Sequence, residues 1–447
     1  MLNRLNLIIT ILIVAALPII VIFGFLLFRG QLPFLKTANQ KTEIVYWGLW
    51  EEEVIKPVLD DFQKINPNIS VTYSRKFKED YFSLLKNKIN SKDGPDIFWF
   101  NSSWFPLFRG SLSSVPRSVY SKEEYEKVFY PVTEQLLLNS EYKGIPIELS
   151  NLVLVANTKY LRNAKFTSPP TSWLELRYQY TPSLTVWSKG RVTRSAVALG
   201  TSSNVNNAAA ILATLMMQEG VKFTSDGKVT FDKSETFDGN NLGADALTFY
   251  TSFAGNNGTW NETFPDSITT FKKGLVAMIF LTSEELKTLV DEKSLLFTVS
   301  PVPQVPTKKK VVFGTFWANG VNNSSEQKVA SWELAKFLSK KEVLEKVFTN
   351  EQRIQGLGRP YPRADMKEKL SSDKFFAAVV NQGELTQSWY LDEDSAEGSL
   401  NLPMVKIFKD TIDNVIRTSS AVGALHSSAG EAQKLLDSVT GVQPNQN

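Results

Sequence analysis

Cysteine is absent from this sequence of 447 residues, and histidine occurs once, at His426. The absence of cysteine excludes disulfide bonds, thiol nucleophiles and cysteine-ligated metals. A single imidazole leaves almost no material for a zinc site or for a histidine-assisted nucleophile. We therefore expect no cofactor, no metal site and no catalytic residue, and we interpret the chain as a binding protein rather than an enzyme.

A marked excess of either charge is also absent. Lysine and arginine total 49 residues against 46 aspartates and glutamates, which gives a formal net charge of +3. The short basic run at residues 308–310 is interpreted as a solvated loop, and no glycine-rich phosphate-binding motif occurs. Nothing in this balance supports a nucleic-acid partner. The hydrophobic content of 43% and the length are typical of a globular chain with two or three domains.

One long uncharged run begins at Leu7 and ends at Phe28. A helix over these residues would be about 33 Å long at about 1.5 Å per residue, which is enough to cross a bilayer. We expect an uncleaved membrane-anchoring transmembrane helix within residues 1–30, followed by a linker at 31–42. A cleaved signal peptide is the alternative, although its apolar region usually has only about 7–15 residues.

The body begins with an alternation of strand and helix patterns. The spacing of apolar residues predicts strands at 43–46, 69–73 and 97–100, with helices at 54–65 and 81–89. This order is typical of an α/β fold with a parallel-rich sheet covered by helices. Ligands of such sheets bind at loops beyond the carboxyl ends of strands. Two such loops, 47–51 and 101–104, are rich in tryptophan and hydrogen-bonding groups.

Residues 142–161, YKGIPIELSNLVLVANTKYL, form the stretch around which we organise the chain. The short apolar run at 152–156 predicts a buried strand. Glu148, Ser150 and Asn151 interrupt the apolar pattern just before that run. Strands with polar groups at mid-length often pass through a ligand cleft, but the residues alone favour an ordinary strand with one solvated end.

Several further segments follow in a recognisable order. They are Asp93-Gly94-Pro95-Asp96-Ile97, Pro169-Pro170-Thr171-Ser172-Trp173, Phe271-Lys272-Lys273-Gly274, Ala277-Met278, Pro301-Val302-Pro303, Ala330-Ser331-Trp332-Glu333-Leu334-Ala335 and Gly358-Arg359-Pro360-Tyr361-Pro362. In this order and spacing, residues 43–440 resemble the extracellular solute-binding proteins of ABC importers, the family of the maltose-binding protein. No single motif is specific; their order carries the resemblance.

The resemblance implies a two-lobed, type II periplasmic-binding-protein-like α/β fold with three hinge crossovers. Lobe 1 would hold residues 43–150 and 298–352, lobe 2 would hold 151–297 and 353–440, and 441–447 would be a tail. It also implies a monomeric receptor on the extracytoplasmic side of a membrane, with ABC permease subunits as partners. The charges around residues 7–28 do not themselves favour that orientation, because Arg4 precedes the run while Arg29, Lys36 and Lys41 follow it.

We expect the ligand to be a carbohydrate, in particular an oligosaccharide. Sugars offer apolar C–H faces and a belt of hydroxyls, so their sites need flat aromatic rings and hydrogen-bonding side chains. By resemblance, the expected aromatic surfaces are Trp47, Trp50, Trp104, Trp317, Tyr361 and Trp389, and we assign all five of these tryptophans to loops that edge the cleft. The expected polar partners are Glu51, Asn101, Ser102, Glu148, Ser150 and Asn151.

The other tryptophans are interpreted differently. Trp99, Trp173 and Trp332 lie in strand or helix patterns and are expected in the core, whereas the patterns around Trp187 and Trp260 favour neither role. The family's acidic residue in the first crossover aligns best with Ser150. Many sugar-binding members carry a stacking tryptophan after their Ala-Met strand, but here residues 279–284 contain none.

Other functions stay open. The chain could be a binding module for sensing or adhesion, or a receptor for a polyamine or a peptide, since amines also favour aromatic faces and carboxylates. Amino acids are disfavoured because no arginine lies in the expected loops to hold a carboxylate. A glycosidase-like enzyme with Glu51 and Glu148 as its carboxylate pair is the least supported reading.

Overall fold

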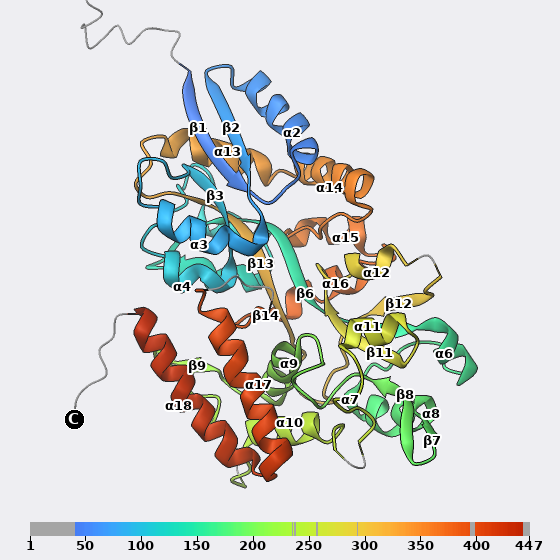
Figure 1. The fold of residues 1–447 in the computed structure, drawn as a ribbon. Helices are drawn as coiled ribbons and strands as arrows, with labels where there is room; N and C mark the ends of the chain where they lie inside the picture. Colours follow the sequence, from blue (N-terminus) through green and yellow to red (C-terminus); the bar gives the residue numbers. More distant parts are fainter. Residues whose placement is uncertain are drawn as a thin grey trace, which may run out of the picture.

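The computed structural model describes residues 41–440, except residues 235, 237, 256–257, 293 and 394–397. The predicted membrane run at 7–28 and the tail at 441–447 therefore lie outside the described residues. Within the described ranges, no helix combines the length and the apolar character that a bilayer crossing requires. The described chain folds into a mixed α/β structure with two lobes, called here the upper and lower lobes after their places in Figure 1.

The upper lobe begins with the predicted β-α-β-α-β order. Its elements are β1 (Thr42–Gly48), α2 (Glu52–Ile65), β2 (Ile69–Arg75), α3 (Lys78–Lys88) and β3 (Ile97–Asn101). β1 pairs in parallel with both β2 and β3, which confirms the predicted parallel arrangement. The apolar face of α2 is buried, and α13 (Lys328–Leu338) and α14 (Lys341–Gln355) complete the covering layer.

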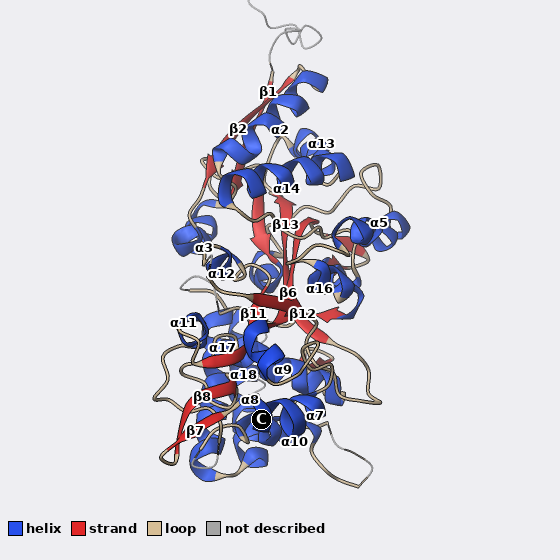
Figure 2. Cartoon of the chain, turned by 90° about the vertical axis from the view of Figure 1, so that its right-hand side faces the viewer, coloured by secondary structure: helices blue, strands red, loops and turns tan. Residues whose placement is uncertain are grey.

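One sheet of ten strands runs through both lobes. Its main order is β2-β1-β3-β13-β6-β11-β8-β7, with β12 (Phe297–Ser300) also paired to β6 and β14 (Thr386–Gln387) to β13. The long antiparallel strands β6 (Ile145–Asn157) and β13 (Val312–Val321) pass from one lobe toward the other. They lie at the centre of the chain, as Figure 2 shows, and connect the two halves of the sheet.

Strand β6 is longer than the predicted run at 152–156. It has 13 residues, all of them buried. Pro146 lies inside it, beside an irregularity at which Ile147 has no partner, because the consecutive residues Trp317 and Ala318 of β13 pair with Glu148 and Pro146. Proline has no N–H for the ladder, so it is tolerated at such an irregularity. The sequence pattern marked only the apolar part of the strand because the polar part is buried by other elements.

The lower lobe contains the rest of the sheet and most of the later helices. These elements are α6 (Thr158–Asn163), α7 (Trp173–Glu175), β7 (Val186–Ser188), β8 (Arg191–Val197), α9 (Ala208–Glu219), α10 (Leu242–Thr251), α11 (Ser267–Lys272), β11 (Val276–Thr282), α17 (Asn401–Thr418) and α18 (Ala421–Thr440). β8 ends at Val197, and the chain then turns at Gly200 with a φ of +115°.

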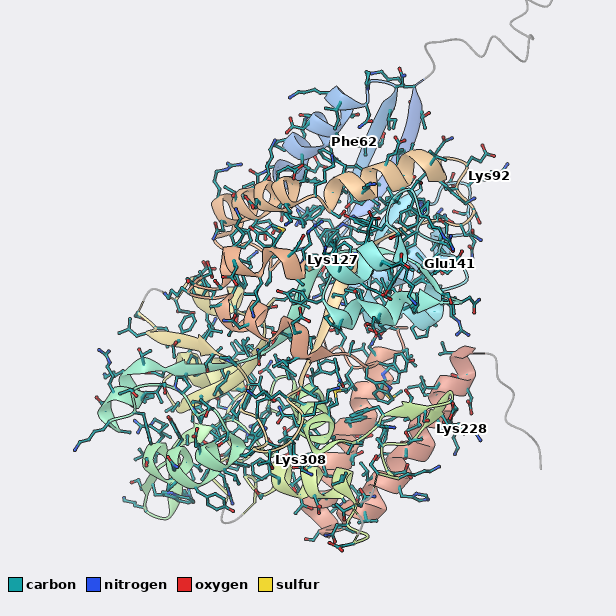
Figure 3. The ribbon with its side chains drawn as sticks, turned by 180° about the vertical axis from the view of Figure 1, so that it is seen from behind. Phe62, Lys92, Lys127, Glu141, Lys228 and Lys308 are labelled. Carbon is teal, nitrogen blue, oxygen red and sulfur yellow. The ribbon has the colours of Figure 1, made fainter. Side chains whose placement is uncertain are left out.

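Shorter elements join these layers. They are α4 (Phe105–Phe108), α5 (Lys122–Val128), β4 (Leu137–Leu138), β5 (Glu141–Tyr142), α8 (Thr181–Leu184), β9 (Thr224–Ser225), β10 (Lys228–Val229), α12 (Lys287–Val290), α15 (Lys367–Leu370) and α16 (Ala377–Asn381). Lys308 lies on the rear of the lower lobe (Figure 3), where it pairs with Glu219 at 3.5 Å beside the exposed Lys309 and Lys310. This agrees with the solvated loop predicted there.

Asp96 ties the start of β3 to its neighbours. Its carboxylate accepts hydrogen bonds from the backbone N–H of Val45 at 2.8 Å and from the hydroxyl of Ser325 at 2.5 Å. We expect Asp96→Ala to lower the free energy of unfolding by about 1–3 kcal/mol, because it leaves those donors without their acceptor. Urea unfolding of the two proteins, followed by circular dichroism, measures this difference.

Asp93 provides the matched control, three residues earlier in the same motif. Its side chain is 83% exposed and lies 3.8 Å from Lys88. Asp93→Ala should change the free energy of unfolding by less than about 0.5 kcal/mol. Equal losses in the two variants would contradict a structural role specific to Asp96.

Candidate functional site

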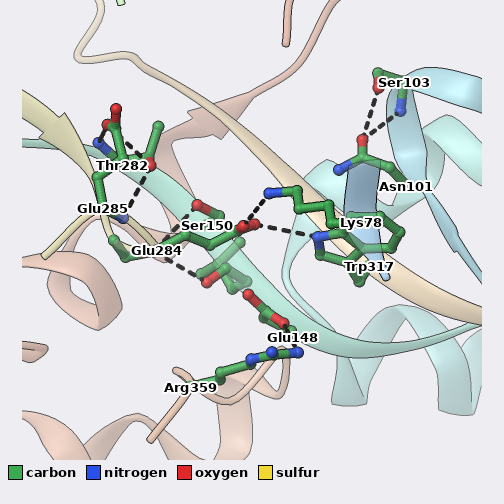
Figure 4. Close-up of polar contacts among 12 residues, drawn as sticks. Lys78, Asn101, Ser103, Glu148, Ser150, Thr282, Glu284, Glu285, Trp317 and Arg359 are labelled. Atoms are coloured by element: carbon green, nitrogen blue, oxygen red, sulfur yellow. Dashed lines mark hydrogen bonds and ion pairs between the residues drawn. The ribbon is translucent and has the colours of Figure 1, made fainter. Parts of the chain in front are cut away.

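A buried polar face lies where β6 and β13 pair at the boundary of the two lobes. Glu148 pairs with Trp317 across the strands, and Ser150 pairs with Thr315. Alternate residues of a strand point to the same side, so these four side chains share one face of the sheet. All four are buried. We call this face, together with Lys78, Glu284 and Arg359, the junction site (Figure 4).

Glu284 is held at the junction site by contacts with the upper lobe. It follows β11 of the lower lobe, and its carboxylate accepts hydrogen bonds from Lys78 Nζ at 2.7 Å and from Trp317 Nε1 at 3.1 Å. Burial acts to raise the pKa of Glu284, but the nearby ammonium of Lys78 outweighs it and the net shift is downward. Glu284 is therefore an anion that links the two lobes.

The turn that carries Glu284 is fixed by its neighbour. The carboxylate of Glu285 accepts hydrogen bonds from the backbone N–H of Thr282 at 2.7 Å and from Asn207 Nδ2 at 2.6 Å. On the other side, Ser283 Oγ lies 3.1 Å from Ser150 Oγ on β6. These contacts hold the turn against the floor of the junction site, so Glu284 is presented by a structured segment.

Arg359 lies between two buried carboxylates. Its guanidinium is 3.2 Å from Glu148 Oε2 and 3.1 Å from Glu351 Oε1, and it lies over the ring of Trp99 at 5.2 Å. Burial raises the pKa of Glu148 to about 8 and also raises the pKa of Glu351, although Arg359 opposes both shifts. One guanidinium cannot neutralise two buried carboxylates, which favours a proton on one of them near neutral pH.

Sequence reasoning did not find Arg359, Lys78 or Glu284. We disfavoured amino acids as ligands because no arginine lies in the expected loops. In the structure, Arg359 reaches Glu148 from the Gly/Pro-rich segment at 358–362. Two features of the sequence could have indicated these residues. They are the charged Arg359 within that segment and the acidic pair Glu284-Glu285 that follows the apolar strand β11.

A small pocket lies beside the floor of the junction site. Its volume is about 20 Å³, and its lining includes Ser150, Asn207, Thr282, Thr315 and Glu393. A cavity of this size is enough for about one water molecule. The described conformation therefore offers no room for a sugar at this point.

Three of the predicted aromatic residues belong to one cluster. Trp50 packs edge-on against Trp99 with ring centroids 4.4 Å apart, and Trp317 lies 5.2 Å from Trp104 and 6.0 Å from Trp99. Each of these four rings is at most 2% exposed. Trp317 lies in β13 and Trp47 in β1, not in loops, because tertiary pairing extends both strands past their apolar patterns.

The remaining aromatic candidates lie elsewhere. Trp389 packs among Phe223, Phe231 and Phe408 in the lower lobe, and Tyr361 packs against Phe348. Trp47 lies under the ammonium of Lys76, which is 4.1 Å from the ring centroid. All three predicted aromatic residues are buried in the described conformation.

The other polar candidates are engaged locally. Asn101 Oδ1 accepts from the backbone N–H and the hydroxyl of Ser103, and Ser102 Oγ accepts from the N–H of Phe316. Asn151 lies on the face opposite Ser150, where its Nδ2 donates to Val379 O and Thr386 Oγ1. Glu51 pairs with Arg75 at the edge of the upper lobe, and both side chains are partly exposed.

Metal-binding chemistry is not found in the described part of the chain. No group of three or more histidine, aspartate or glutamate side chains converges there in a way that could hold an ion. His426 has an 81% exposed side chain and lies 2.9 Å from Asp232.

Comparison with known proteins identifies the family. A family profile described as bacterial extracellular solute-binding protein matches residues 58–377. The chain belongs to this family. The match confirms the predicted resemblance, and it covers most of the body of this solute-binding protein. A sequence search among curated proteins gives no significant match.

Solved structures share the fold. The sugar-binding protein MalE from Xanthomonas citri matches with a TM-score of 0.71 and 18% identity, over 90% of this chain and 100% of that one. The cyclic α-maltosyl-1,6-maltose-binding protein from Arthrobacter globiformis gives 0.71 and 16%, over 89% and 100%. A tagatose-bound ABC transporter solute-binding protein from Thermotoga lettingae gives 0.64 and 17%, over 89% and 100%. At these identities the likeness establishes the two-lobed fold.

We expect the pair Lys78–Glu284 to favour closure of the solute-binding protein. Glu284→Gln removes the charge but keeps an acceptor for Trp317, so it isolates the ion pair. The two side chains are 33% and 25% exposed, and such a pair contributes about 0.5–1 kcal/mol. The population of separated lobes should therefore rise about two- to fivefold, and small-angle scattering without added solute should report a larger radius of gyration.

Glu292→Gln is the matched control for this measurement. Glu292 pairs with Lys272 at 3.3 Å at comparable exposure, but both residues belong to the lower lobe. Its scattering should equal that of the unmodified protein. The same scattering curve for Glu284→Gln as for Glu292→Gln would rule out a role of Lys78–Glu284 in closure.

Proposed function

We propose that this solute-binding protein is the extracytoplasmic receptor of an ABC importer, and that it binds a carbohydrate, in particular an oligosaccharide, between its lobes. The observation that carries the proposal is the fold match, over about nine-tenths of the chain, to solved proteins named for sugars. The family and these relatives are binding proteins, which supports a receptor rather than an enzyme. Delivery of the ligand to permease subunits follows from the same family.

The chemistry of the junction site supports this ligand class. Indole rings, carboxylates, a guanidinium and hydroxyls converge there from Trp317, Glu148, Glu284, Arg359 and Ser150. Sugar hydroxyls donate to carboxylates and accept from cationic groups, while their C–H faces pack on aromatic rings. Two cations face three carboxylates there, and the raised pKa of Glu148 favours a proton on one of them, so a neutral ligand with many hydroxyls fits the site better than a strongly charged one.

Binding at the junction site requires motion. The pocket there has a volume of about 20 Å³, so the lobes have to separate before a sugar enters. We propose that residues 43–150 and 298–352 move as one lobe against 151–297 and 353–440, about crossovers near Ser150, Thr298 and Leu357. A ligand shifts this equilibrium only if it contacts one state more favourably, which requires groups from both lobes.

Isothermal calorimetry against oligosaccharides, polyamines and peptides tests the ligand class. We expect heat from at least one neutral oligosaccharide, and a dissociation constant about tenfold or more higher for Glu51→Gln. Glu51 is a carboxylate at the edge of the upper lobe, and a hydrogen bond to a charged group is worth about 1.5–3 kcal/mol. Glu51→Gln removes the charge of this acceptor, which weakens its hydrogen bond with a hydroxyl of the bound sugar.

The adjacent Glu52 supplies the control, because it is exposed and belongs to the first turn of α2. Glu52→Gln should leave the dissociation constant unchanged. Heat from a polyamine with no response to any sugar would overturn the carbohydrate assignment. If Glu51→Gln and Glu52→Gln raised the dissociation constant equally, Glu51 would have no specific role in the ligand site.

We also propose that residues 7–28 anchor the mature receptor in the membrane. This proposal rests on the length of the uncharged run and on the absence of a cysteine that could carry a lipid. Mass spectrometry of the intact protein purified from membranes should give an N-terminus before Leu7. A mature chain that begins near Asn39 or Gln40 would replace the anchor with a cleaved signal peptide.

A further inference from the structure

An open trough lies in the lower lobe, away from the junction site. It is bounded by the hairpin of β7 and β8, by residues 254–255, 258 and 261–263 after α10, and by the C-terminal half of α17. Its volume is about 800 Å³, within the range of ligand-binding pockets. Every residue that lines it belongs to the lower lobe, so its shape does not depend on how the two lobes are arranged.

Trp187 on β7 lines this trough and is 47% exposed. The structure describes all ten tryptophans of the chain, and each of the other nine is at most 6% exposed. Leaving a large aromatic ring in water forgoes the favourable free energy of burying it. An exposed ring beside a pocket with converging polar groups is therefore the arrangement expected of a ligand-contacting surface.

A hydrogen-bond network holds the part of the lining formed by Thr201, Asn261 and Glu262. The fully buried Trp260 donates from Nε1 to Thr201 Oγ1 at 3.0 Å and to Asn204 Oδ1 at 2.9 Å. Asn204 Nδ2 in turn donates to the carbonyl oxygens of Asn261 and Phe264 at 3.1 and 2.9 Å. This network holds the loop that carries Asn261 and Glu262, so this part of the lining is organised before a ligand arrives.

The carboxylates of the trough accept hydrogen bonds from the hydroxyls of the buried Ser202 and the exposed Ser203. Asp413 accepts a hydrogen bond from Ser202 Oγ at 2.5 Å, and Glu262 accepts one from Ser203 Oγ at 3.2 Å. Each carboxylate has lone pairs for further donors. Arg191 supplies donors from the β8 side. Two carboxylates against one guanidinium disfavour an anionic ligand and suit a neutral molecule with many hydroxyls.

We propose that this trough is a second carbohydrate-binding surface, which takes a neutral oligosaccharide against Trp187 independently of the junction site. The indole face packs on the C–H face of a sugar ring. Asp413 and Glu262 accept hydrogen bonds from its hydroxyls, and Arg191 donates to its oxygens. The surface goes beyond the proposed transport ligand site, because a glycan chain can be held here whether the lobes are open or closed.

Acrylamide quenching of tryptophan fluorescence tests the proposal, because Trp187 is the indole that the quencher reaches most easily. The probes are maltohexaose, cellohexaose, xylohexaose and chitohexaose, with spermidine as the amine probe. We expect at least one oligosaccharide to protect the fluorescence saturably. Trp187→Phe should abolish the protected signal, and Asp413→Asn should raise the apparent dissociation constant about tenfold. Glu262→Gln provides a second variant if Asp413→Asn fails to fold.

Tyr178→Ala is the matched control, since Tyr178 is a 72% exposed aromatic residue of the lower lobe outside the trough lining. It should leave the protection unchanged, as should Glu51→Gln in the upper lobe. Protection that disappears in Glu51→Gln would assign the binding to the interlobe site and overturn the proposal. Absence of protection by all four oligosaccharides, or protection by spermidine alone, would also overturn it. Protection of Trp187 without any calorimetric effect of Glu51→Gln would instead count against the interlobe proposal alone.

Discussion

The antiparallel pairing of β6 with β13 is the interaction on which the rest of the structure depends. It joins the upper and lower parts of one ten-stranded sheet, and every residue of both strands is buried. Side chains of a strand alternate between two faces, so this pairing also decides which polar groups reach the junction site. A shift of one residue would exchange Glu148 and Ser150 for their apolar neighbours. The register shifts between Trp317 and Ala318, next to Pro146, so the pairing of Glu148 and Ser150 holds on only one side of this irregularity.

The charged side chains around β6 and β13 lie close to groups of opposite charge. Glu284 faces Lys78 from the opposite lobe, while Glu148 and Glu351 share Arg359. Removing charged groups from water is unfavourable unless each finds a partner, and three carboxylates here face two cations. The upward pKa shifts of Glu148 and Glu351 are the expected response of a site short of positive charge. A neutral polyol adds no further charge to this balance.

Local patterns predicted much of the upper lobe, because apolar spacing alone distinguishes the helices and strands between β1 and β3. The order of short motifs also predicted the family. Sequence patterns were less informative for segments whose structure depends on contacts with residues distant in the sequence. Trp317 is a strand residue only because β6 and β3 flank it, and Arg359 meets Glu148 across a separation of 211 residues. The helix α18 was missed although Leu425, Ala429, Ala432 and Leu436 follow helical spacing and are buried.

The place of β13 in the sheet has a consequence for how the chain acquires its structure. β3 finds its second neighbour only in β13, and Ser102 and Phe316, which meet beside that pairing, are 214 residues apart in sequence. Until the later strand is available, the upper lobe keeps an unpaired edge, and contacts so distant in sequence form slowly. The upper lobe, although its first strands are synthesised first, therefore stays incomplete until residues 312–321 are available. Such a delay would suit a polypeptide whose body is moved across a membrane before it folds.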